Sequence, residues 1–411
     1  MSQNVYILGG AQTDFSRNWA REGLDLFDMF SECLTDAVAK ADVQPEQIEV
    51  GHVGTFNAQL FTGQGILGGL FAHVFPEMRM MPSSCHEAAC ASGSMALMAA
   101  MRDIMCGHYQ TSAVIGIEMM RNTDGKTAAE YLGAATWKGV EAQDADYPWP
   151  HMFDLIVDEY DKRYGINTEH LKTIGKTNFG NGSQNPNAQT RQWDFPEGCF
   201  SDDDKLNPVI EGRVRKLDCG QVTDGAASVV LASEEFVSKY AADRGIKLSG
   251  IPRIKGWGHR CGPLLLDRKL ELSKDEALIF PHAALCGLEA AQRAGFEKVS
   301  DLDGLETHDC FSITEYMAID HLGLTAPGQS WQAVEEGVIQ KDGRFPINPS
   351  GGLIGLGHPV GATGVRMLLD CYKQCTGTAG GYQLEDVQNM MTFNVGGSTT
   401  TCASFVVGTG P

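Results

Sequence analysis

The sequence predicts an α/β fold made of two similar halves with a loop-forming insertion. Short apolar strands alternate with amphipathic or apolar helices, which is the pattern of an α/β protein. The last third of the chain repeats the first third in outline, and the composition changes over residues 121–222. The 411 residues suffice for two domains or for one large pseudo-duplicated body.

The first third of the chain holds alternating strand and helix patterns. The predicted strands are residues 4–9, residues 50–56, a short segment after Pro82, and residues 112–118. The predicted helices are an amphipathic one over 24–41, a glycine-interrupted one over 63–74, and one that is apolar on nearly all sides over 91–107. A helix of the last kind has to be buried on most of its surface.

Residues 121–222 form the predicted insertion. Aromatic residues, Asn, Asp, Gly and Pro interrupt short helices there, such as the one over 153–164. Segments of this kind are typical of loops that cover a functional site. Five aromatic side chains either line a substrate tunnel or form the insertion's own core: Tyr131, Trp137, Tyr147, Trp149 and Phe153.

Regular patterns return after the insertion. The first predicted element, over 224–232, is a turn or helix start that runs into an apolar strand. The elements after it are a strand over 253–258, a helix over 281–295, a strand that ends at 309–311, a glycine-rich segment over 348–357, a helix over 361–372, and strands over 390–393 and 403–407. The buried side of the helix over 281–295 is expected to consist of Ala284, Leu288, Ala291 and Ala294. In each half one reactive residue precedes a helix and a closing strand, which supports internal duplication.

The charge and the cysteines limit the function. The formal net charge of −20 argues against nucleic acid or an anionic membrane as a partner, because phosphates would meet a repulsive field. Arg213, Arg215 and Lys216 form a basic cluster that either binds a phosphorylated ligand or is a solvated surface. Twelve dispersed cysteines without a CxxC pair indicate a reduced, cytoplasmic enzyme. Neither a signal peptide at residues 1–10 nor a membrane-spanning segment is predicted.

Cys90 is the first candidate for chemistry. It lies in Glu87-Ala-Ala-Cys-Ala-Ser-Gly-Ser94, before small residues at the start of a predicted helix. The free N–H groups and the dipole of a helix N-terminus favour the nucleophilic thiolate. Cysteines that lack this setting are interpreted as packing residues: Cys85, Cys106, Cys261, Cys286, Cys371 and Cys402.

The second candidate is His358, in the glycine-rich run from Asn348 to Gly364. An imidazole between glycine turns and a helix start suits a general base or a hydrogen-bond donor to a thioester oxygen. A phosphate-binding loop is the alternative for a run of this composition. However, neither GKS/T nor the GxGxxG spacing is present in it.

Two further segments complete the set. His308 and Cys310, two residues apart at a strand end, would share one face and suit acid–base work beside a nucleophile. A metal site is not predicted, because no HxxxH or CxxC supplies further ligands. The backbone N–H groups of Asn394-Val-Gly-Gly397 are candidates for binding an oxyanion.

Together these four segments resemble the fingerprints of the thiolase family. The resemblance covers essentially the whole chain and includes residues 7–13, 116–120 and 224–227. It implies the thiolase fold, in which two βαβαβαββ halves form a five-layered αβαβα body with an inserted loop domain over the active site. The implied parts are an N-terminal half over 1–120, continued by about 223–265, a loop domain over 121–222, and a C-terminal half over 266–411.

The resemblance also implies roles for the site residues. Cys90 matches the nucleophile that accepts the acyl group, and His358 matches the histidine that activates it. His308 matches the Asn or His that contributes to an oxyanion hole through water. The N–H groups of Cys90 and Gly396 match a second oxyanion hole. The resemblance implies coenzyme A as substrate or product without a covalently bound cofactor, and a homodimer or tetramer.

One position departs from the family pattern. Most thiolases carry a second catalytic cysteine near the C-terminus, and Asn394 stands there in this chain. The block His308-Asp-Cys-Phe311 resembles the sterol-carrier-protein-type thiolases, in which its cysteine, here Cys310, takes over acid–base duty.

The predicted function is that of an acyl-CoA C-acyltransferase, an acetyl-CoA acetyltransferase or 3-ketoacyl-CoA thiolase. It would cleave 3-ketoacyl-CoA with CoA, or condense acyl-CoA units, through an acyl-cysteine. Two alternatives stay open because of Asn394. One is a thiolase-like condensing or retro-aldol enzyme that works with a small accessory partner chain, and the other is a catalytically idle acyl-CoA-binding scaffold.

Overall fold

A computed structural model describes residues 4–410 of the chain. Residues 1–3, which belong to the segment considered above as a signal peptide, lie outside the described part. The large sheet has the strand order β3-β2-β4-β7-β1-β8-β11-β10-β9. Its strands are β1 (Val5–Gln12), β2 (Val50–Gly54), β3 (Ser83–His86), β4 (Thr111–Glu118), β7 (Gly225–Ser233), β8 (Arg253–Cys261), β9 (Leu305–Thr307), β10 (Asn389–Gly396) and β11 (Thr401–Gly408).

Helices cover both faces of this sheet and build the insertion. The helices before the insertion are α1 (Leu26–Lys40), α2 (Ala58–Thr62), α3 (Phe71–Val74) and α4 (Ser92–Met105). The insertion holds α5 (Gly125–Leu132), α6 (Pro148–Tyr164), α7 (Thr168–Gly182) and the small strand pair β5 (Val209–Glu211) and β6 (Val214–Arg215). The helices after it are α8 (Glu234–Arg244), α9 (Leu266–Leu272), α10 (Pro281–Arg293), α11 (Ser312–His321), α12 (Ser330–Glu335) and α13 (Thr363–Thr376).

The sheet consists of two strand groups with the same topology. β2 and β4 are parallel, as are β9 and β10, and antiparallel strands follow in both groups in the orders β4-β7-β1 and β10-β11-β8. In the second group, a parallel bridge between Ile347 and Leu305 takes the place that the pairing of β3 with β2 has in the first group. The two groups join through β1 and β8 at only two residue pairs. Each half therefore has the order βαβαβαββ that the resemblance implied.

This topology changes one predicted boundary. β8 pairs with β11 along eight residues, whereas only Val5 and Tyr6 of β1 contact it. Residues 253–261, which the prediction assigned to the N-terminal half, therefore lie in the sheet of the C-terminal half. The composition of this strand does not assign it to either half, so only the pairing reveals its place.

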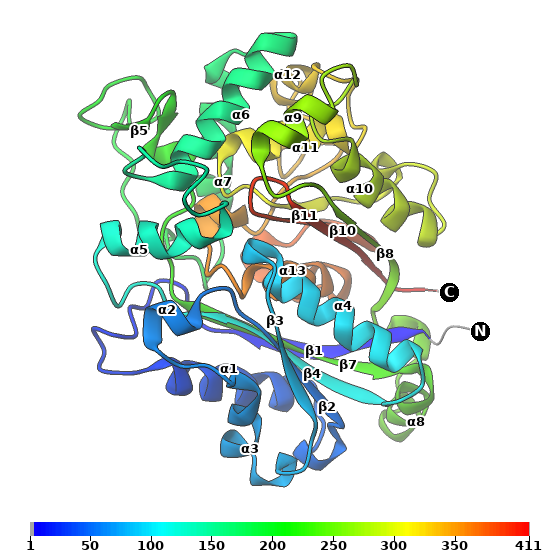
Figure 1. The fold of residues 1–411 in the computed structure, drawn as a ribbon. Coiled ribbons are helices and arrows are strands. Elements are labelled where there is room, and N and C mark those ends of the chain that lie inside the picture. The colour runs from blue at the N-terminus through cyan, green and yellow to red at the C-terminus, as the bar shows by residue number, and fades with distance from the viewer. Residues whose placement is uncertain (1–3, 411) are drawn as a thin grey trace.

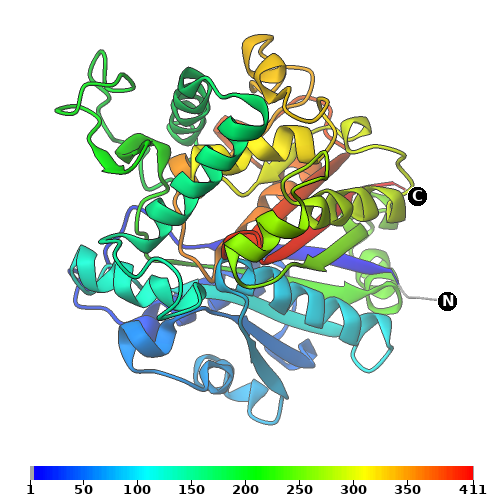
Figure 2. The ribbon, with the colours of Figure 1, turned by 45° about the horizontal axis from the view of Figure 1, so that its top comes forward.

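Five layers result from the way the helices pack. α1 lies on the outer face of β1 and β7, and α10 lies on the outer face of β8 and β11. α4 and α13 contact each other and fill the space between the two strand groups, as Figure 1 shows. The turned view in Figure 2 shows the insertion helices at one end of this body. The predicted αβαβα architecture is confirmed.

The helix α10 shows where the predicted periodicity was wrong. Its buried residues are Ala283, Cys286, Gly287, Ala290 and Ala291, whereas Leu288, which was expected on the buried side, is 37% exposed. The reason is the close approach of this helix to β8. A Cβ atom on either glycine of β8, Gly256 or Gly258, would overlap a carbonyl oxygen of α10. Only the narrow face of the helix fits there, so the leucine faces outward.

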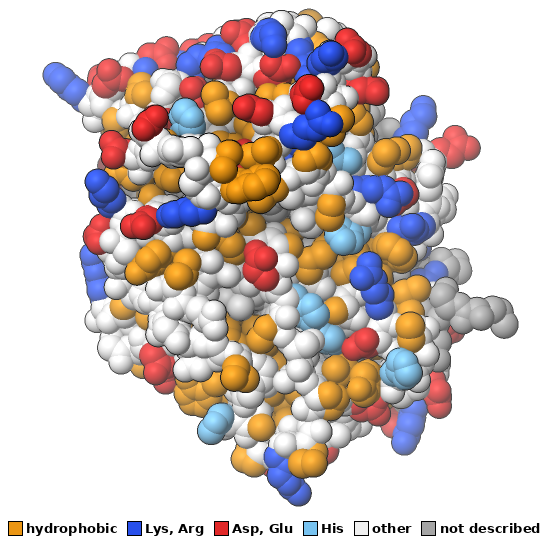
Figure 3. All heavy atoms as spheres, viewed as in Figure 1, with side chains coloured by type: hydrophobic (Ala, Val, Ile, Leu, Met, Phe, Trp, Pro, Cys, Tyr) orange, Lys and Arg blue, Asp and Glu red, His pale blue; other side chains and the backbone are white. Residues whose placement is uncertain are grey.

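The segment predicted as one helix over 63–74 is broken. Gly63, with φ +75°, ends the unpredicted helix α2, and a 3-10 turn at Leu67–Leu70 precedes α3. Among residues 4–410, no helix combines the length and apolar composition that a membrane crossing requires. Figure 3 shows acidic and basic side chains intermixed on one face, without a continuous basic surface among the atoms described there.

Replacing Gly258 tests the close approach of α10 to β8. We expect Gly258→Ala to lower the free energy of unfolding by about 1–3 kcal/mol, because the added methyl group pushes α10 off the strand. The measurement is urea unfolding followed by circular dichroism. Gly250→Ala is the matched control, since no atom lies within 4 Å of its Cβ position. Equal unfolding midpoints for the two variants would contradict this account of the packing.

Candidate active site

Cys90 lies in a tight turn directly before the central helix α4. The turn is a 3-10 segment, Ala89–Ala91, and Ala89 has φ +50°, a left-handed conformation that a non-glycine residue adopts only under constraint. Two hydrogen bonds supply that constraint: the Glu87 carboxylate accepts from the Ala89 N–H at 2.6 Å, and the Ser92 hydroxyl donates to the Ala89 carbonyl at 2.6 Å. The predicted position of Cys90 at a helix start is confirmed.

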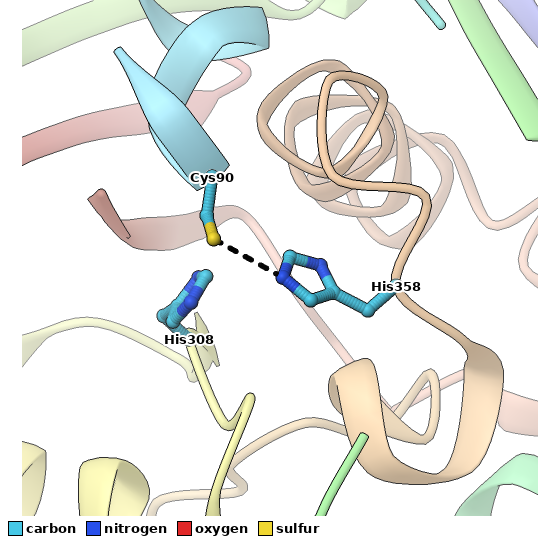
Figure 4. Close-up of side chains that lie close together, drawn as sticks. All are labelled: Cys90, His308 and His358. Atoms are coloured by element: carbon cyan, nitrogen blue, oxygen red, sulfur yellow. Dashed lines mark hydrogen bonds between the residues drawn. The ribbon is translucent and has the colours of Figure 1, made fainter. Parts of the chain in front are cut away.

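His358 faces the Cys90 sulfur from the other half of the protein. The distance from His358 Nε2 to Cys90 Sγ is 3.3 Å, and Figure 4 shows the contact. His358 Nδ1 lies 2.7 Å from Thr363 Oγ1, whose hydroxyl donates to the Pro359 carbonyl at 3.2 Å. Because the Thr363 hydroxyl hydrogen is already donated to Pro359, the Thr363 oxygen accepts a hydrogen bond from the N–H at His358 Nδ1. The lone pair of Nε2 therefore faces the thiol.

Burial keeps this pair neutral. Desolvation raises the pKa of Cys90 to about 12, although the backbone N–H groups of Gly397 and of Cys90 itself lower it. Desolvation, with a smaller contribution from Arg366, lowers the pKa of His358 to about 3. Backbone N–H groups at the helix start favour the thiolate, as expected, but desolvation outweighs them and the thiol keeps its proton. The thiol has to lose its proton to His358 as it reacts.

His308 is the third member of the cluster. Its ring stands edge-on to that of His358, with 5.3 Å between the ring centroids. One ligand atom each of Cys90, His308 and His358 lies within 4.8 Å of the others, and these three are the donors that could hold a metal ion. Asn394 Nδ2 lies 3.0 Å from His308 Nδ1. Asn394 thus contacts the site through its side chain, whereas the sequence pattern drew attention to its backbone.

Cys310 lies on the cavity wall that also holds Cys90 and His358. The strand β9 ends at Thr307, so His308 and Cys310 lie in the loop that follows rather than on one strand. The Cys310 sulfur is buried and lies 3.7 Å from Thr314 Oγ1. Burial, together with the neighbouring Cys90, raises the pKa of Cys310 well above its usual range. The thiol therefore carries a proton in the resting protein.

An apolar cavity of about 250 Å³ leads to these groups. Three of the five aromatic residues singled out in the insertion line it, namely Tyr147, Trp149 and Phe153. Of the other two, Tyr131 packs edge-on against Phe61, and Trp137 is 49% exposed. The remaining aromatic residues of the wall are Phe56 and Phe311, and the latter stacks on Phe153. The wall contains no Lys, Arg, Asp or Glu among the described residues.

The structure does not bring Arg213 and Arg215 to this cavity. Each guanidinium is paired with two carboxylates, at distances between 2.6 and 3.2 Å, and the partners are Asp158, Asp161, Asp202 and Asp204. Both arginines line a separate hollow of the insertion. Their charge is offset locally, which leaves them poorly suited to hold a phosphate at the Cys90 cavity.

The two glycines at the end of β10, Gly396 and Gly397, lie differently. Gly396, the predicted oxyanion donor, ends β10 with its Cα so close to the Ala88 carbonyl oxygen that a Cβ atom has no room. Gly397 lines the cavity, and its backbone N–H lies close enough to the Cys90 sulfur to lower the pKa of that thiol.

Glu118 is a residue of the site region that the sequence reasoning did not single out. Its buried carboxylate accepts from the N–H groups of Phe56, Asn57 and Gly361 at 2.8 to 3.0 Å. It thereby ties the loop after β2, which lines the cavity, to the loop that carries His358. Burial raises its pKa to about 7. The only sequence signal was an acid at the end of an apolar strand.

Known proteins resemble this chain along almost its whole length. The model for "Thiolase, N-terminal domain" matches residues 5–195, and that for "Thiolase C-terminal domain-like" matches residues 267–409. An acetyl-CoA acetyltransferase of Methanothermobacter thermautotrophicus is 30% identical over 401 residues, which are 98% of each chain. Sterol carrier protein 2 of Homo sapiens is 28% identical over 411 residues, which cover 96% of this chain and 70% of that protein.

The fold is also found among solved structures. The structure described as "Ltp2-ChsH2(DUF35) aldolase" superimposes with a TM-score of 0.78 and 20% identity, and the match covers 99% of this chain and 98% of the other. A likeness at this identity concerns the fold alone.

The neutral cysteine–histidine pair predicts how alkylation of Cys90 depends on pH. Because the pKa of the thiol is about 12, we expect its rate of reaction with iodoacetamide to rise from pH 6 to pH 10 without a plateau. The measurement is peptide mass spectrometry of Cys90 against a small thiol with a pKa of about 8.5, whose rate levels off. A plateau for Cys90 below pH 8 would instead indicate a resting thiolate–imidazolium pair.

Proposed function

Since the chain belongs to the thiolase family, we propose that it is an acyl-CoA C-acyltransferase that works through an acyl group on Cys90. It cleaves 3-ketoacyl-CoA with CoA, or condenses acyl-CoA units. The observation that carries the proposal is the 3.3 Å contact between Cys90 Sγ and His358 Nε2 at an apolar cavity. The name of the archaeal relative, an acetyl-CoA acetyltransferase, supports a CoA thioester as the substrate and CoA as a product.

The first half of the reaction uses the neutral pair. In cleavage, His358 takes the thiol proton while the Cys90 sulfur attacks the 3-keto carbonyl carbon. The backbone N–H groups of Cys90 and Gly396 are the proposed donors to the oxyanion that forms, with His308 acting through water on the thioester oxygen of the substrate. The bond between the α carbon and the 3-keto carbon then breaks, which leaves an acyl group on Cys90 and an acetyl-CoA enolate.

Cys310 is the proposed acid for that enolate. A thiol whose pKa is raised holds its proton until a stronger base appears, so it can protonate the α carbon. The resulting thiolate then takes the proton of the incoming CoA thiol, whose sulfur attacks the acyl-Cys90 carbonyl. The bond from the acyl carbon to Cys90 breaks, the new acyl-CoA is released, and His358 returns its proton to the Cys90 sulfur. In condensation the same groups act in reverse, and Cys310 removes the α proton.

Replacing Cys310 separates acylation from turnover. We expect Cys310→Ala to acquire an acetyl group on Cys90 when mixed with acetyl-CoA, but to lose thiolysis of 3-ketoacyl-CoA by about 10²–10⁴-fold. Mass spectrometry of Cys90 and a thiolysis assay over a range of chain lengths measure the two effects. Cys199→Ala, another buried cysteine outside the cavity, is the control. Full turnover by Cys310→Ala would overturn the assigned role, and absence of acetyl-Cys90 in folded wild-type protein would overturn the acyltransferase.

We infer that two copies of the chain associate along β3. This strand is at the end of the sheet, and Ser83, Ser84 and Cys85 are exposed, so its free backbone groups invite pairing with another strand. Two large apolar side chains beside it, Ile66 and Met80, are 89% and 88% exposed. An apolar border next to an open edge supports a homodimer, or a tetramer built from it, rather than an isolated protomer.

Negative charges introduced at Ile66 and Met80 test whether two copies associate along β3. We expect the double variant Ile66→Glu, Met80→Glu to run as a monomer in size-exclusion chromatography with light scattering, because two carboxylates would be buried without partners. Leu272→Glu, at a side chain that is 57% exposed on α9, should leave the oligomeric state unchanged. A double variant Ile66→Glu, Met80→Glu that is still a dimer would contradict an interface along β3.

We also propose that turnover can depend on a small accessory chain. The aldolase neighbour is named for two proteins, and its backbone superimposes with a TM-score of 0.78. Thiolysis and retro-aldol assays with and without co-expressed partner proteins test this second function.

The cytoplasmic location stays a prediction from the dispersed thiols.

A further inference from the structure

Asn394 and Ser94 form a short buried chain of hydrogen bonds that ends on His308. The Ser94 hydroxyl donates to Asn394 Oδ1 at 2.7 Å, and Asn394 Nδ2 lies 3.0 Å from His308 Nδ1. An amide nitrogen can only donate. His308 Nδ1 must therefore accept this hydrogen bond with its lone pair.

The orientation of the amide is fixed. Asn394 Oδ1 is the only acceptor for the Ser94 hydroxyl within residues 4–410, and both residues are buried. A reversed amide would leave the hydroxyl hydrogen enclosed without a partner. Space is equally limited, because a Cβ atom at Gly364 would overlap Ser94 Oγ and stand 2.8 Å from Asn394 Oδ1. The amide oxygen thus lies toward the Cα hydrogens of Gly364, which favour an acceptor at this position over an N–H donor.

The ring of His308 is neutral in this setting. Burial lowers the pKa of His308 well below its usual range, and the neighbouring His358 and Arg366 lower it further. A neutral imidazole carries one proton. Since Nδ1 accepts from Asn394, that proton is on Nε2.

We infer that Asn394 is a positioning residue that holds His308 as its Nε2–H tautomer, so that the ring donates a hydrogen bond to the site and cannot bind a metal ion. The two histidines of the site are thereby set to opposite roles. Thr363 accepts from Nδ1 of His358, which leaves that ring a lone pair on Nε2. Asn394 donates to Nδ1 of His308, which leaves that ring a proton on Nε2.

The three donors Cys90, His308 and His358 would form a zinc site only if His308 offered a lone pair. One Cys and two His ligands with an open fourth position make a catalytic zinc site, and the three donors here lie within 4.8 Å of one another. A histidine that binds zinc normally gives its other N–H to an acceptor. His308 meets a donor at Nδ1 and carries a proton on Nε2, so neither nitrogen offers a lone pair. Only Cys90 and His358 remain, and two ligands hold zinc poorly.

The catalytic part rests on the proposed acyl transfer. An oxyanion needs donors that are in place before charge develops. A His308 ring that exchanged its tautomers would, for part of the time, offer a lone pair in place of an N–H to the water through which it acts on the oxyanion. The asparagine that stands where the family's second cysteine is expected thus has a different role, since it fixes the donor while Cys310 is the proposed acid.

Asn394→Asp reverses the hydrogen bond without changing the size of the side chain. A carboxylate accepts from His308 Nδ1–H, so the lone pair moves to Nε2 and the carboxylate–histidine pair favours zinc. We expect turnover to fall by about 10²-fold, because His308 no longer donates a hydrogen bond to the water that holds the oxyanion. We also expect zinc ions to protect Cys90 from iodoacetamide at a concentration at least about tenfold lower than in the wild type. Nitrogen-15 NMR of labelled histidine should report the changed tautomer directly.

Two further variants separate positioning from stability. Ser94→Ala frees the amide to turn, and we expect part of the gain in zinc protection without any new carboxylate. Ser404→Ala removes a buried hydrogen bond from the same strand pair, to the Thr392 carbonyl, and should lower stability without changing zinc protection or the tautomer.

The outcomes distinguish this inference from the proposed function. Zinc protection that improves in Asn394→Asp but not in Ser404→Ala supports it. Zinc protection or a tautomer that is the same in Asn394→Asp as in the wild type overturns it, even if the wild type is an active thiolase. An inactive wild type with a zinc-sensitive Asn394→Asp variant would overturn the acyltransferase and leave the role of Asn394 intact.

Discussion

The site depends on how closely the first turns of α4 and α13 approach each other. A Cβ atom on Gly93, in the first turn of α4, would come within 2.6 Å of the Gly361 carbonyl oxygen, just before α13. Gly116 on β4 faces the same carbonyl and also has no room for a side chain. These glycines let two helix starts, one from each half, meet without side chains between them. Cys90 and His358 are thereby brought to 3.3 Å, although 268 residues separate them in the chain.

The same contact places the thiol and the imidazole in apolar surroundings, and this decides their protonation states. A helix start by itself would favour a thiolate, but the partly buried sulfur lies at an apolar cavity, and desolvation of an anion costs more than a few backbone N–H groups return. The resting pair is therefore neutral on both sides. Charge forms only when a substrate supplies an electrophile, and it forms next to N–H donors that are already in place. Enclosure and reactivity are two consequences of one packing arrangement.

Local patterns in the sequence predicted the parts of this arrangement that local chemistry determines. The alternation of strands and helices was right, and so was the start of a helix after Cys90 and after the His358 loop. The errors came from contacts between distant segments. Leu288 faces outward because two glycines of β8 take the inner face of α10, and Arg213 and Arg215 are occupied by carboxylates on other elements. Asn394, which accepts the hydrogen bond of the Ser94 hydroxyl, is 300 residues away in the chain. No periodicity or spacing contains such information.

Two loops of the C-terminal half bring two histidines to one sulfur, and the hydrogen-bond partner of each ring makes the two histidines different. The loop before α13 carries His358, and the loop after β9 carries His308, and both belong to the C-terminal half, opposite the helix that starts after Cys90. Two identical imidazoles at that point would be interchangeable, each able to accept, donate or bind a metal ion. A hydroxyl that accepts from one ring and an amide that donates to the other make them different. One neighbour for each ring is enough, because a neutral imidazole has a single proton to place.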